Sequence, residues 1–474
     1  MTQKITISPV TRIEGHAKIT IQLDDDGKVN EALFHVEQFR GFEKFSEGRM
    51  FYEMPQITPR TCGICPVSHH LASTKACDKI ASTAPTLTAH KLRDLMHMGQ
   101  IVQSHGMHFF ELAGPDLILG FDADPAIRNV AGVIQTNPEL AVKAVKLRAF
   151  GQEIIRRLGE RRIHPIFGIP GGVTRPLLPE DREWILNEVD AQIDTTLVGI
   201  SLFKDWASQN QDVMNEFAVF PSAYMGLVQP DGALELYDGK LRLVDAEGDQ
   251  LELFDPCDYL DYIGEHVQNF SYLKAPFYKK IGWPDGVYRV GPLGRLNAAT
   301  HISTPIAQGE MKIWKSLNDG KPVEGTLYFH YARLIEVIYA LERVKELMDD
   351  PDILRTDVAN LAGPISGEGV GCLEAPRGTL FHHYWTDELG VIRKANMIVA
   401  TGHNAWAMNH SINLVAKRYV DGNKLTEGML NRVEAAIRAH DPCLSCSTHA
   451  MGQMPIHIEL VSATGEVLDT LHRD

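Results

Sequence analysis

The chain has 474 residues, of which 44% are hydrophobic and 23% are charged, a composition typical of a globular protein with a sizeable core. Its 46 basic and 61 acidic residues give a net charge of −15, which disfavours nucleic acid and anionic membrane surfaces as partners. No apolar run approaches the roughly 20 residues that span a bilayer, and the N-terminal residues carry no basic-then-apolar export signal. We therefore expect a soluble, intracellular protein.

The predicted elements begin with strands. Short runs of alternating apolar residues, at 5–7, 17–21 and 32–36, flank an Asp-rich turn and predict strands near the N-terminus. Apolar residues at helical spacing predict long helices further along the chain. These helices are expected at 90–112, 138–158, 179–214 and around 331–341. Residues 224–254 are typical of an inserted β-meander, because short apolar runs alternate with Gly-containing turns.

This pattern predicts an α+β fold that is predominantly helical, with a large helical core, N-terminal strands and the inserted meander. The chain has no internal repeat and no long linker, so we expect a single interwoven body over residues 1–449. Within it, residues 1–57 form the β-rich part and residues 218–255 contain the meander. Alternating apolar residues followed by a turn are typical of a C-terminal hairpin in the tail at 450–474.

Four of the seven cysteines form two Cys-x-x-Cys pairs, Cys62 with Cys65 and Cys443 with Cys446. Each pair can place two sulfurs on one metal, and two pairs that meet would form a four-thiolate site. Such soft ligands favour nickel, zinc, copper(I) or iron. The alternatives are a structural zinc site and two unrelated pairs of buried thiols. Zinc sites usually separate their pairs by about 15–20 residues, whereas these pairs lie near opposite ends of the chain.

The residues around these pairs carry a resemblance. Arg-Thr-Cys-Gly-Ile-Cys at 60–65, followed by His69, and Asp-Pro-Cys-Leu-Ser-Cys-Ser-Thr-His at 441–449 resemble motifs of the large subunit of nickel–iron hydrogenases. Further segments resemble motifs of the same family, and they lie at 9–16, 40–43 and 374–378. The flanks of the cysteine pairs look most like the cytoplasmic, NAD-reducing bidirectional branch. The resemblance therefore implies a cytoplasmic enzyme and that family's fold.

The resemblance implies a nickel–iron centre that splits or forms dihydrogen heterolytically. Cys62 and Cys443 would be terminal nickel ligands, and Cys65 and Cys446 would bridge nickel to an iron that carries carbon monoxide and cyanide. Metal charge would compensate the four thiolates. Glu14 matches the family's proton carrier. The alternative for Glu14 is a surface carboxylate or an ion pair with a nearby arginine.

A second set of residues would surround the iron. The resemblance places Arg377 over the open metal position and Thr401 as a hydroxyl donor to cyanide, with Pro376 in the segment that covers the iron. Asp441 would order Arg377. The alternatives are an ordinary ion pair between Arg377 and Glu374, and a turn built on Asp441.

Two further predictions concern histidines. His69 would donate to a bridging sulfur, with a core histidine as the alternative. Glu43 and His449 match ligands of a magnesium site, with a surface salt bridge as the alternative. Ser104 stands where the family often carries aspartate, so we expect a different network beside Arg377.

The sequence contains no motif for a redox cofactor that would carry electrons away from the centre. The remaining cysteines, Cys77, Cys257 and Cys372, are too few and too dispersed to suggest an iron–sulfur cluster. The resemblance implies a small subunit with an iron–sulfur cluster, and diaphorase subunits with FMN and iron–sulfur clusters that reduce NAD. It also implies a maturation protease that cuts after His449 and removes residues 450–474.

Three alternative functions remain open. The first is a hydrogenase with another acceptor, deazaflavin or thiol–disulfide, or a hydrogen sensor. The second is a quinone-binding subunit of the respiratory complex I type, but those relatives lack the four cysteines. The third is a zinc-stabilised interaction protein without enzymatic activity.

Overall fold

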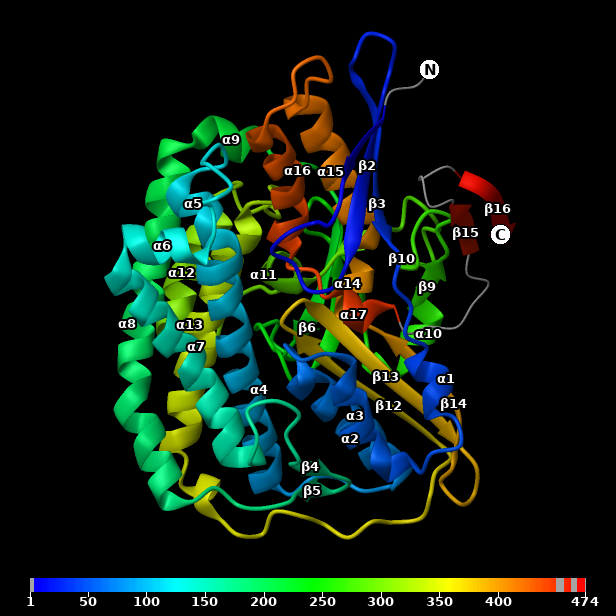
Figure 1. The fold of residues 1–474 in the computed structure, drawn as a ribbon. Coiled ribbons are helices and arrows are strands. Elements are labelled where there is room, and N and C mark those ends of the chain that lie inside the picture. Colours follow the sequence, from blue (N-terminus) through cyan, green and yellow to red (C-terminus); the bar gives the residue numbers. More distant parts are fainter. Residues whose placement is uncertain (1–3, 449–455, 462–466, 474) are drawn as a thin grey trace.

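The computed structural model describes residues 4–448, 456–461 and 467–473. Long helices fill one half of the molecule, and the larger sheets lie in the other half (Figure 1). The core helices are α4 (Leu87–Met107), α7 (Pro138–Gly159), α8 (Pro179–Gln209) and α13 (Tyr328–Asp349). α4 packs against α7 and α13, and α8 packs against the same two helices. The predicted α+β fold with a large helical core is therefore confirmed.

Two predicted helices differ from their expected bounds. The helix expected at 179–214 ends at Gln209, and α9 (Gln211–Glu216) follows after Asn210, whose backbone is not helical. The helix expected at 90–112 is regular only to Met107 and continues as one π-helical segment, η3 (His108–Ala113). None of the described helices is both long and apolar enough to cross a bilayer.

The N-terminal strands form an antiparallel sheet, in the order β1 (Lys4–Ile7), β2 (Ala17–Leu23) and β3 (Val29–Val36). The sheet lies against α15 (Ala405–Tyr419), whose Asn409 and Asn413 accept hydrogen bonds from the backbone of β3. Because β1 and β2 are joined by residues 8–16, this loop projects from the end of the sheet into the body.

The predicted meander is also confirmed. Strands β6 (Ala223–Val228), β7 (Lys240–Val244) and β8 (Gln250–Phe254) pair antiparallel in chain order. A short fourth strand, β11 (Tyr288–Arg289), adds in parallel to β6. The three strands of the meander are therefore part of a four-stranded sheet and do not form a separate unit.

A third sheet was not expected from the sequence. Strands β12 (Glu368–Ala375), β13 (Gly378–Thr386) and β14 (Ile392–Ile398) pair antiparallel and lie against α3 (Pro66–Ile80). Nearly every residue of β12 and most of β13 are buried, so these strands lack the alternation that identifies a half-exposed strand. The sheet brings the β12–β13 turn close to the chain segment that precedes α3.

The C-terminal part contains α14 (Ala400–His403), α16 (Glu427–His440) and α17 (Leu444–Ser447), followed by an antiparallel hairpin of β15 (Ile456–Val461) and β16 (Val467–Arg473). The remaining elements are short. They are α1 (Phe42–Ser46), η1 (Phe51–Glu53), α2 (Met54–Ile57), η2 (Thr58–Thr61), α5 (Gly114–Leu119), α6 (Val130–Thr136), β4 (Gly168–Ile169), β5 (Gly172–Val173), η4 (Pro256–Asp258), α10 (Tyr259–Tyr262), β9 (Ile263–His266), β10 (Ala275–Tyr278), α11 (Gly291–Ala298), α12 (Pro305–Ser316) and η5 (Pro351–Leu354).

Candidate metal centre

The two cysteine pairs meet in the interior. The four Sγ atoms of Cys62, Cys65, Cys443 and Cys446 all lie within 4.8 Å of one another. The Sγ–Sγ distance is 3.2 Å between Cys62 and Cys443, 3.4 Å between Cys65 and Cys446, and 2.9 Å between Cys443 and Cys446. Each residue is at most 5% exposed. Two unrelated pairs of thiols are therefore excluded as an account of these residues.

Local structure explains how each pair converges. Cys62 directly follows η2, and Cys65 immediately precedes α3, whose first residue is Pro66, a residue well suited to a helix start. The backbone N–H groups of Ile64 and Cys65 lie 3.2 and 3.4 Å from Cys62 Sγ, which folds the turn around that sulfur. Cys443 likewise precedes the short helix α17, which contains Cys446.

The N-terminal loop is joined to the second cysteine pair through the backbone. Glu14 N–H donates to the carbonyl of Pro442 at 3.4 Å, and Leu444 N–H donates to the carbonyl of Glu14 at 3.1 Å. The next residue, Gly15, has φ +89°, and a Cβ there would lie 2.8 Å from Leu444 Cβ. Only glycine fits this conformation and close approach without strain.

This joint puts the Glu14 side chain on a cysteine. Glu14 Oε2 lies 3.1 Å from Cys443 Sγ and accepts a hydrogen bond from Ser445 N–H at 3.0 Å. The alternative ion pair with Arg12 is not formed, because Arg12 pairs with Asp116 at 2.6 Å. Glu14 thus contacts a candidate metal ligand directly.

Arg377 occupies the tight turn between β12 and β13. Its Nε donates to the backbone carbonyl of Asp441 at 2.6 Å, and its Nη2 donates to Asp441 Oδ1 at 2.9 Å. Both side chains are about 2% exposed. Glu374, the other candidate partner, pairs with Arg295 instead. The remaining nitrogen, Arg377 Nη1, is buried and has no hydrogen-bond partner among the described residues, so this donor can serve a bound group.

An enclosed cavity adjoins the sulfurs. Its lining includes Cys65 and Cys446 together with Pro376, Arg377 and Thr401. The Thr401 hydroxyl oxygen accepts a hydrogen bond from the Cys443 N–H at 3.0 Å, which holds α14 against the second cysteine pair. The polar donors and the thiols therefore face one small space.

Burial limits how far the thiols can ionise. Hydrogen bonds from Cys443, Cys446 and Cys65 hold the pKa of Cys62 well below its usual range, whereas burial raises the pKa values of Cys443 and Cys446 well above theirs. One thiolate is thus stabilised at the expense of its neighbours. Full ionisation of the set needs compensating positive charge, which metal ions bound by the thiolates would provide. The donor set and its burial fit a centre of soft metals.

His69, on α3, lines the same cavity. Its Nδ1 lies 3.0 Å from Nε2 of His382, on β13. His382 was not among the predicted site residues. The sequence offers only the adjacent pair His382-His383 as a signal, and this pair does not reveal which histidine contacts His69.

The predicted magnesium ligands are only partly described. Glu43, on α1, accepts a hydrogen bond from Met397 N–H at 2.7 Å and is not among the described residues that line the cavity. His449 lies outside the described residues. Ser104 is fully buried on α4, and its hydroxyl has no hydrogen-bond partner in the described part of the chain.

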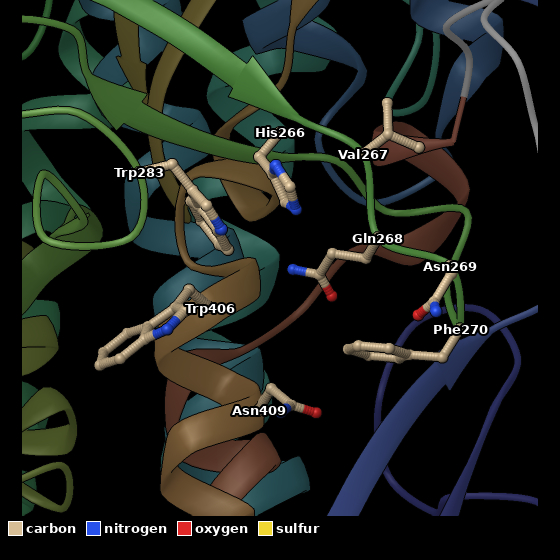
Figure 2. Close-up of a pocket in the computed structure, with 8 residues that line it drawn as sticks. All are labelled: His266, Val267, Gln268, Asn269, Phe270, Trp283, Trp406 and Asn409. Atoms are coloured by element: carbon tan, nitrogen blue, oxygen red, sulfur yellow. The ribbon is translucent and has the colours of Figure 1, made fainter.

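The rest of the described chain holds no second cluster of metal-binding side chains. Cys77 and Cys372 are buried separately, and Cys257 is exposed. An open cleft of about 410 Å³ lies between the β9–β10 region and α15, with Trp283, Trp406 and Gln268 among its walls (Figure 2). None of the predicted site residues lines this cleft.

Two family profiles match the chain. One, described as nickel-dependent hydrogenase, matches residues 40–139 and 228–449. The other, described as HoxL-like, matches residues 4–39. Together they contain the four cysteines and most of the chain.

Known proteins are similar over nearly the whole length. The chain is 43% identical over 484 aligned positions to the NAD-reducing hydrogenase HoxS subunit beta of Cupriavidus necator, covering 99% of each chain. It is 46% identical over 414 positions to a vhu subunit of the F420-non-reducing hydrogenase of Methanococcus voltae, covering 87% of this chain and 98% of that one.

Solved structures share the fold. A crystal structure of an NAD+-reducing NiFe-hydrogenase in the H2-reduced state has a TM-score of 0.92 at 42% identity, and the match covers 94% of this chain and 100% of that chain. The Ni-Fe-Se hydrogenase of D. vulgaris Hildenborough in the reduced state has a TM-score of 0.75 at 23% identity, covering 95% and 100%. At that identity the second match concerns the fold alone.

Proposed function

The chain belongs to the nickel-dependent hydrogenase family, and we propose that it splits or forms dihydrogen heterolytically at a nickel–iron centre and exchanges the electrons with NAD through partner subunits. One observation carries the proposal: four buried cysteines from both ends of the chain converge within 4.8 Å, in a protein 43% identical over 99% of its length to a component of an NAD-reducing hydrogenase.

The four sulfurs lie close enough together to serve two metals, and the shortest Sγ–Sγ distance, 2.9 Å, joins Cys443 to Cys446. Cys62 lies against Cys443, and Cys65 lies against Cys446. As the family resemblance implies, Cys62 and Cys443 would hold nickel as terminal ligands, and Cys65 and Cys446 would be the thiolates shared between nickel and iron. Cys65, Cys443 and Cys446 line the cavity, whereas Cys62 is not among the described residues that do. When bound, such a centre supplies the polarisation that splits dihydrogen.

Three residues would hold the small ligands of the iron, carbon monoxide and cyanide. Pro376 and Thr401 line the cavity beside Arg377, whose Nη1 is the buried donor without a partner among the described residues. A guanidinium remains charged at any physiological pH, so Arg377 can stabilise an anionic ligand such as cyanide. Asp441 fixes the direction of that guanidinium through two hydrogen bonds.

Glu14 would carry the proton. Its Oε2 lies 3.1 Å from Cys443 Sγ, within hydrogen-bonding reach, so a proton on this sulfur can pass directly to the carboxylate. The Ser445 N–H bond holds the same oxygen in place. The carboxylate can then release the proton away from the sulfurs, and the reverse sequence serves hydrogen formation.

The electrons need partner subunits. The scattered positions of Cys77, Cys257 and Cys372 support the view that the iron–sulfur clusters lie elsewhere. We propose a small subunit with an iron–sulfur cluster, and diaphorase subunits with FMN and iron–sulfur clusters that reduce NAD in the cytoplasm. The match to the NAD-reducing relative, which covers 99% of both chains, supports this acceptor.

A second candidate keeps the centre and changes the acceptor. Relatives that are 45–46% identical are named F420-non-reducing hydrogenases, so identity alone does not select the acceptor. Other relatives with this name are 42% identical over 98–99% of this chain, so coverage does not select the acceptor either. We favour NAD because a solved NAD+-reducing NiFe-hydrogenase matches 94% of this chain with a TM-score of 0.92. Hydrogen-dependent reduction should be measured in the purified complex with NAD, with the deazaflavin F420 and with a viologen dye. Activity with the dye but not with NAD would overturn the NAD assignment and leave the hydrogenase intact.

Two further proposals concern the ends of the body. Glu43, whose carboxylate suits a hard cation, would bind magnesium together with His449. A maturation protease would then cut after His449, so that the single body 1–449 is the active form and residues 450–474 are removed. Intact mass spectrometry of the metal-loaded protein should give a chain ending at His449, and a chain ending at Asp474 would contradict this.

Metal analysis tests the centre itself. The purified protein should contain nickel and iron in equal amounts, and infrared spectra should show iron-bound carbon monoxide and cyanide. Cys446→Ser should abolish both signals, whereas Cys257→Ser, at the exposed cysteine, should leave them unchanged. Zinc without nickel and iron would instead support a structural zinc site.

A further inference from the structure

A second buried arginine contacts the turn that carries Arg377. Arg295, on α11, donates from Nη1 to the backbone carbonyl of Ala375 at 2.8 Å and from Nη2 to that of Pro376 at 3.2 Å. These are the two residues that precede Arg377 in the turn between β12 and β13. A buried backbone carbonyl needs a hydrogen-bond donor, and Arg295 supplies one to each of them.

Two carboxylates hold Arg295 itself in place. Glu336, on α13, accepts from Nε at 2.7 Å and from Nη2 at 2.6 Å, so this pair is bidentate. Glu374 Oε2 accepts from Nη1 at 2.9 Å. All three side chains are fully buried. An arginine has five N–H donors, and with the two backbone carbonyls every one of them in Arg295 has its own acceptor.

Both carboxylates are joined to other parts of the fold. His105, on α4, lies with its Nε2 2.8 Å from Glu336 Oε2. Burial would raise the pKa of Glu336, but the charge of Arg295 and its hydrogen bonds lower that pKa to about 2, so the carboxylate stays ionised. Glu374 Oε1 accepts from the Thr379 hydroxyl at 2.8 Å, which joins β12 to β13 across the turn. The arginine therefore ties the turn to α4 and α13 of the helical core.

We propose that Arg295 is a positioning residue: by holding the two carbonyls that precede Arg377, it fixes the backbone from which that side chain extends. Asp441 fixes the outer end of the same side chain through two hydrogen bonds. The direction of Arg377 Nη1, the buried donor that has no partner among the described residues, depends on both ends. This inference rests on the proposed function, in which Arg377 stabilises cyanide on the iron.

A simpler role for Arg295 is neutralisation of buried carboxylates, and a matched control separates the two roles. Arg93, on α4, is also fully buried and binds both oxygens of Asp78, at 2.6 and 3.1 Å. It donates to the backbone carbonyls of Ile169 and Gly172, each at 2.8 Å. The described residues that line the cavity do not include Arg93 or these partners. Arg93→Lys and Arg295→Lys thus each remove a buried guanidinium that binds a carboxylate and two carbonyls.

The test measures infrared spectra of the metal-loaded complex at matched nickel and iron contents. Arg295→Lys keeps the charge but loses the planar fork, so the turn can take more than one position and each band of iron-bound cyanide should split. Arg93→Lys should give the bands of the unmodified protein, although both variants should lower the urea midpoint. A lowered midpoint with unchanged cyanide bands in Arg295→Lys would overturn the positioning role.

A milder variant keeps the test decisive if Arg295→Lys does not fold. Thr379→Val removes only the hydroxyl that donates to Glu374 and should split the cyanide bands by a smaller amount. Thr326→Val is its control, because the buried Thr326 hydroxyl donates to the carbonyl of Ala218 instead. Equal spectra for these two variants would contradict the role of the Arg295 contacts in holding the turn.

A double-mutant cycle shows whether Arg295 acts through Arg377. Arg295→Lys alone should lower hydrogen oxidation by roughly 10-fold, whereas in the Arg377→Lys background it should cost less than about twofold. Losses that simply multiply would overturn the inference. If Arg377→Lys itself leaves the cyanide bands unchanged, the proposed contact between Arg377 and cyanide is wrong. If it changes them while Arg295→Lys does not, the proposed function stands and the positioning role fails.

Discussion

The backbone of Glu14 is held beside Cys443 by hydrogen bonds to the neighbouring residues, and its carboxylate contacts the Cys443 sulfur. The two backbone hydrogen bonds to Pro442 and Leu444 set the position of the loop, and the close approach at Gly15 leaves no room for a side chain. With the backbone held there, the carboxylate lies 3.1 Å from the Cys443 sulfur. The position of the Glu14 carboxylate at the site therefore depends on the backbone contacts of residues 14 and 15 with the second cysteine pair.

We expect Glu14→Gln to lower hydrogen oxidation by roughly 10²–10⁴-fold, because the amide keeps the shape of the side chain but cannot accept the proton. Nickel and iron contents should stay the same, as should the melting temperature. Glu37→Gln, at an exposed carboxylate paired with Lys18, is the control and should retain full activity. Near-normal turnover of Glu14→Gln would rule out Glu14 as the proton carrier.

Arg377 makes two hydrogen bonds to one residue, Asp441, in a fully buried setting. Lysine keeps the charge but lacks the planar fork, so Arg377→Lys should lose about 10²-fold in hydrogen oxidation. Arg393→Lys, which changes an exposed partner of Asp387, should have no measurable effect. Steady-state rates on proteins of matched metal content provide the measurement. Equal rates for Arg377→Lys and the unmodified enzyme would show that charge alone suffices.

At the scale of elements, the packing of α3 on β12 decides whether the first cysteine pair meets the Arg377 turn. Glycines allow the contact. A Cβ at Gly371 would lie 1.9 Å from the carbonyl oxygen of Ala72, and one at Gly369 would lie 2.2 Å from that of Ala76. The strand backbone therefore lies directly against the helix backbone, and any larger residue would push the two apart.

Gly371→Ala should accordingly destabilise the protein by about 1–3 kcal/mol and reduce the nickel content, because α3 begins at the residue after Cys65. Gly309→Ala is the opposite case, since a Cβ at this position in α12 meets nothing within 4 Å. That change should stabilise the helix by about 0.5–1 kcal/mol. Urea unfolding of both variants provides the comparison. A neutral Gly371→Ala would mean that β12 can move away from α3 at little cost.

At the scale of the whole molecule, several histidines are buried away from the cysteines. Five histidines from four helices are buried and hold their pKa values far below the usual 6.5, because burial disfavours the charged ring. They are His70 at about 4, and His97, His105, His330 and His403 at about 3.

These histidines predict a loss of stability in mild acid. Below pH 6.5 the unfolded chain binds protons on these rings, whereas the folded chain does not until the pH approaches 3–4. Stability is therefore complete above pH 6.5 and falls as the pH drops, by up to about 1.4 kcal/mol per pH unit for each ring. The urea midpoint, measured from pH 7.5 to pH 5, should fall steadily. An unchanged midpoint across this range would contradict the burial of these rings as neutral groups.

The sequence alone determined much about this protein, for reasons that are local. The Cys-x-x-Cys spacing and its flanks identified all four thiols of the cluster, because a short turn by itself brings each pair together. α7 and α8 were predictable because buried residues recur at helical spacing between exposed ones, and the meander was predictable from its glycine-containing turns. Arg377 and Asp441 were identified in advance as partners, but only through resemblance, since nothing in their spacing reveals the contact.

The tertiary structure alone decided which groups meet across the chain. Cys62 and Cys443 are 381 residues apart in sequence, and His69 and His382 are 313 apart, so no periodicity connects them. The sheet of β12, β13 and β14 could not be anticipated, because strands buried on both faces lose their alternation. Side-chain direction in such a strand, which separates His382 from His383, depends on what packs against each face. The local sequence therefore identifies the cysteine pairs, and long-range packing decides which residues they meet.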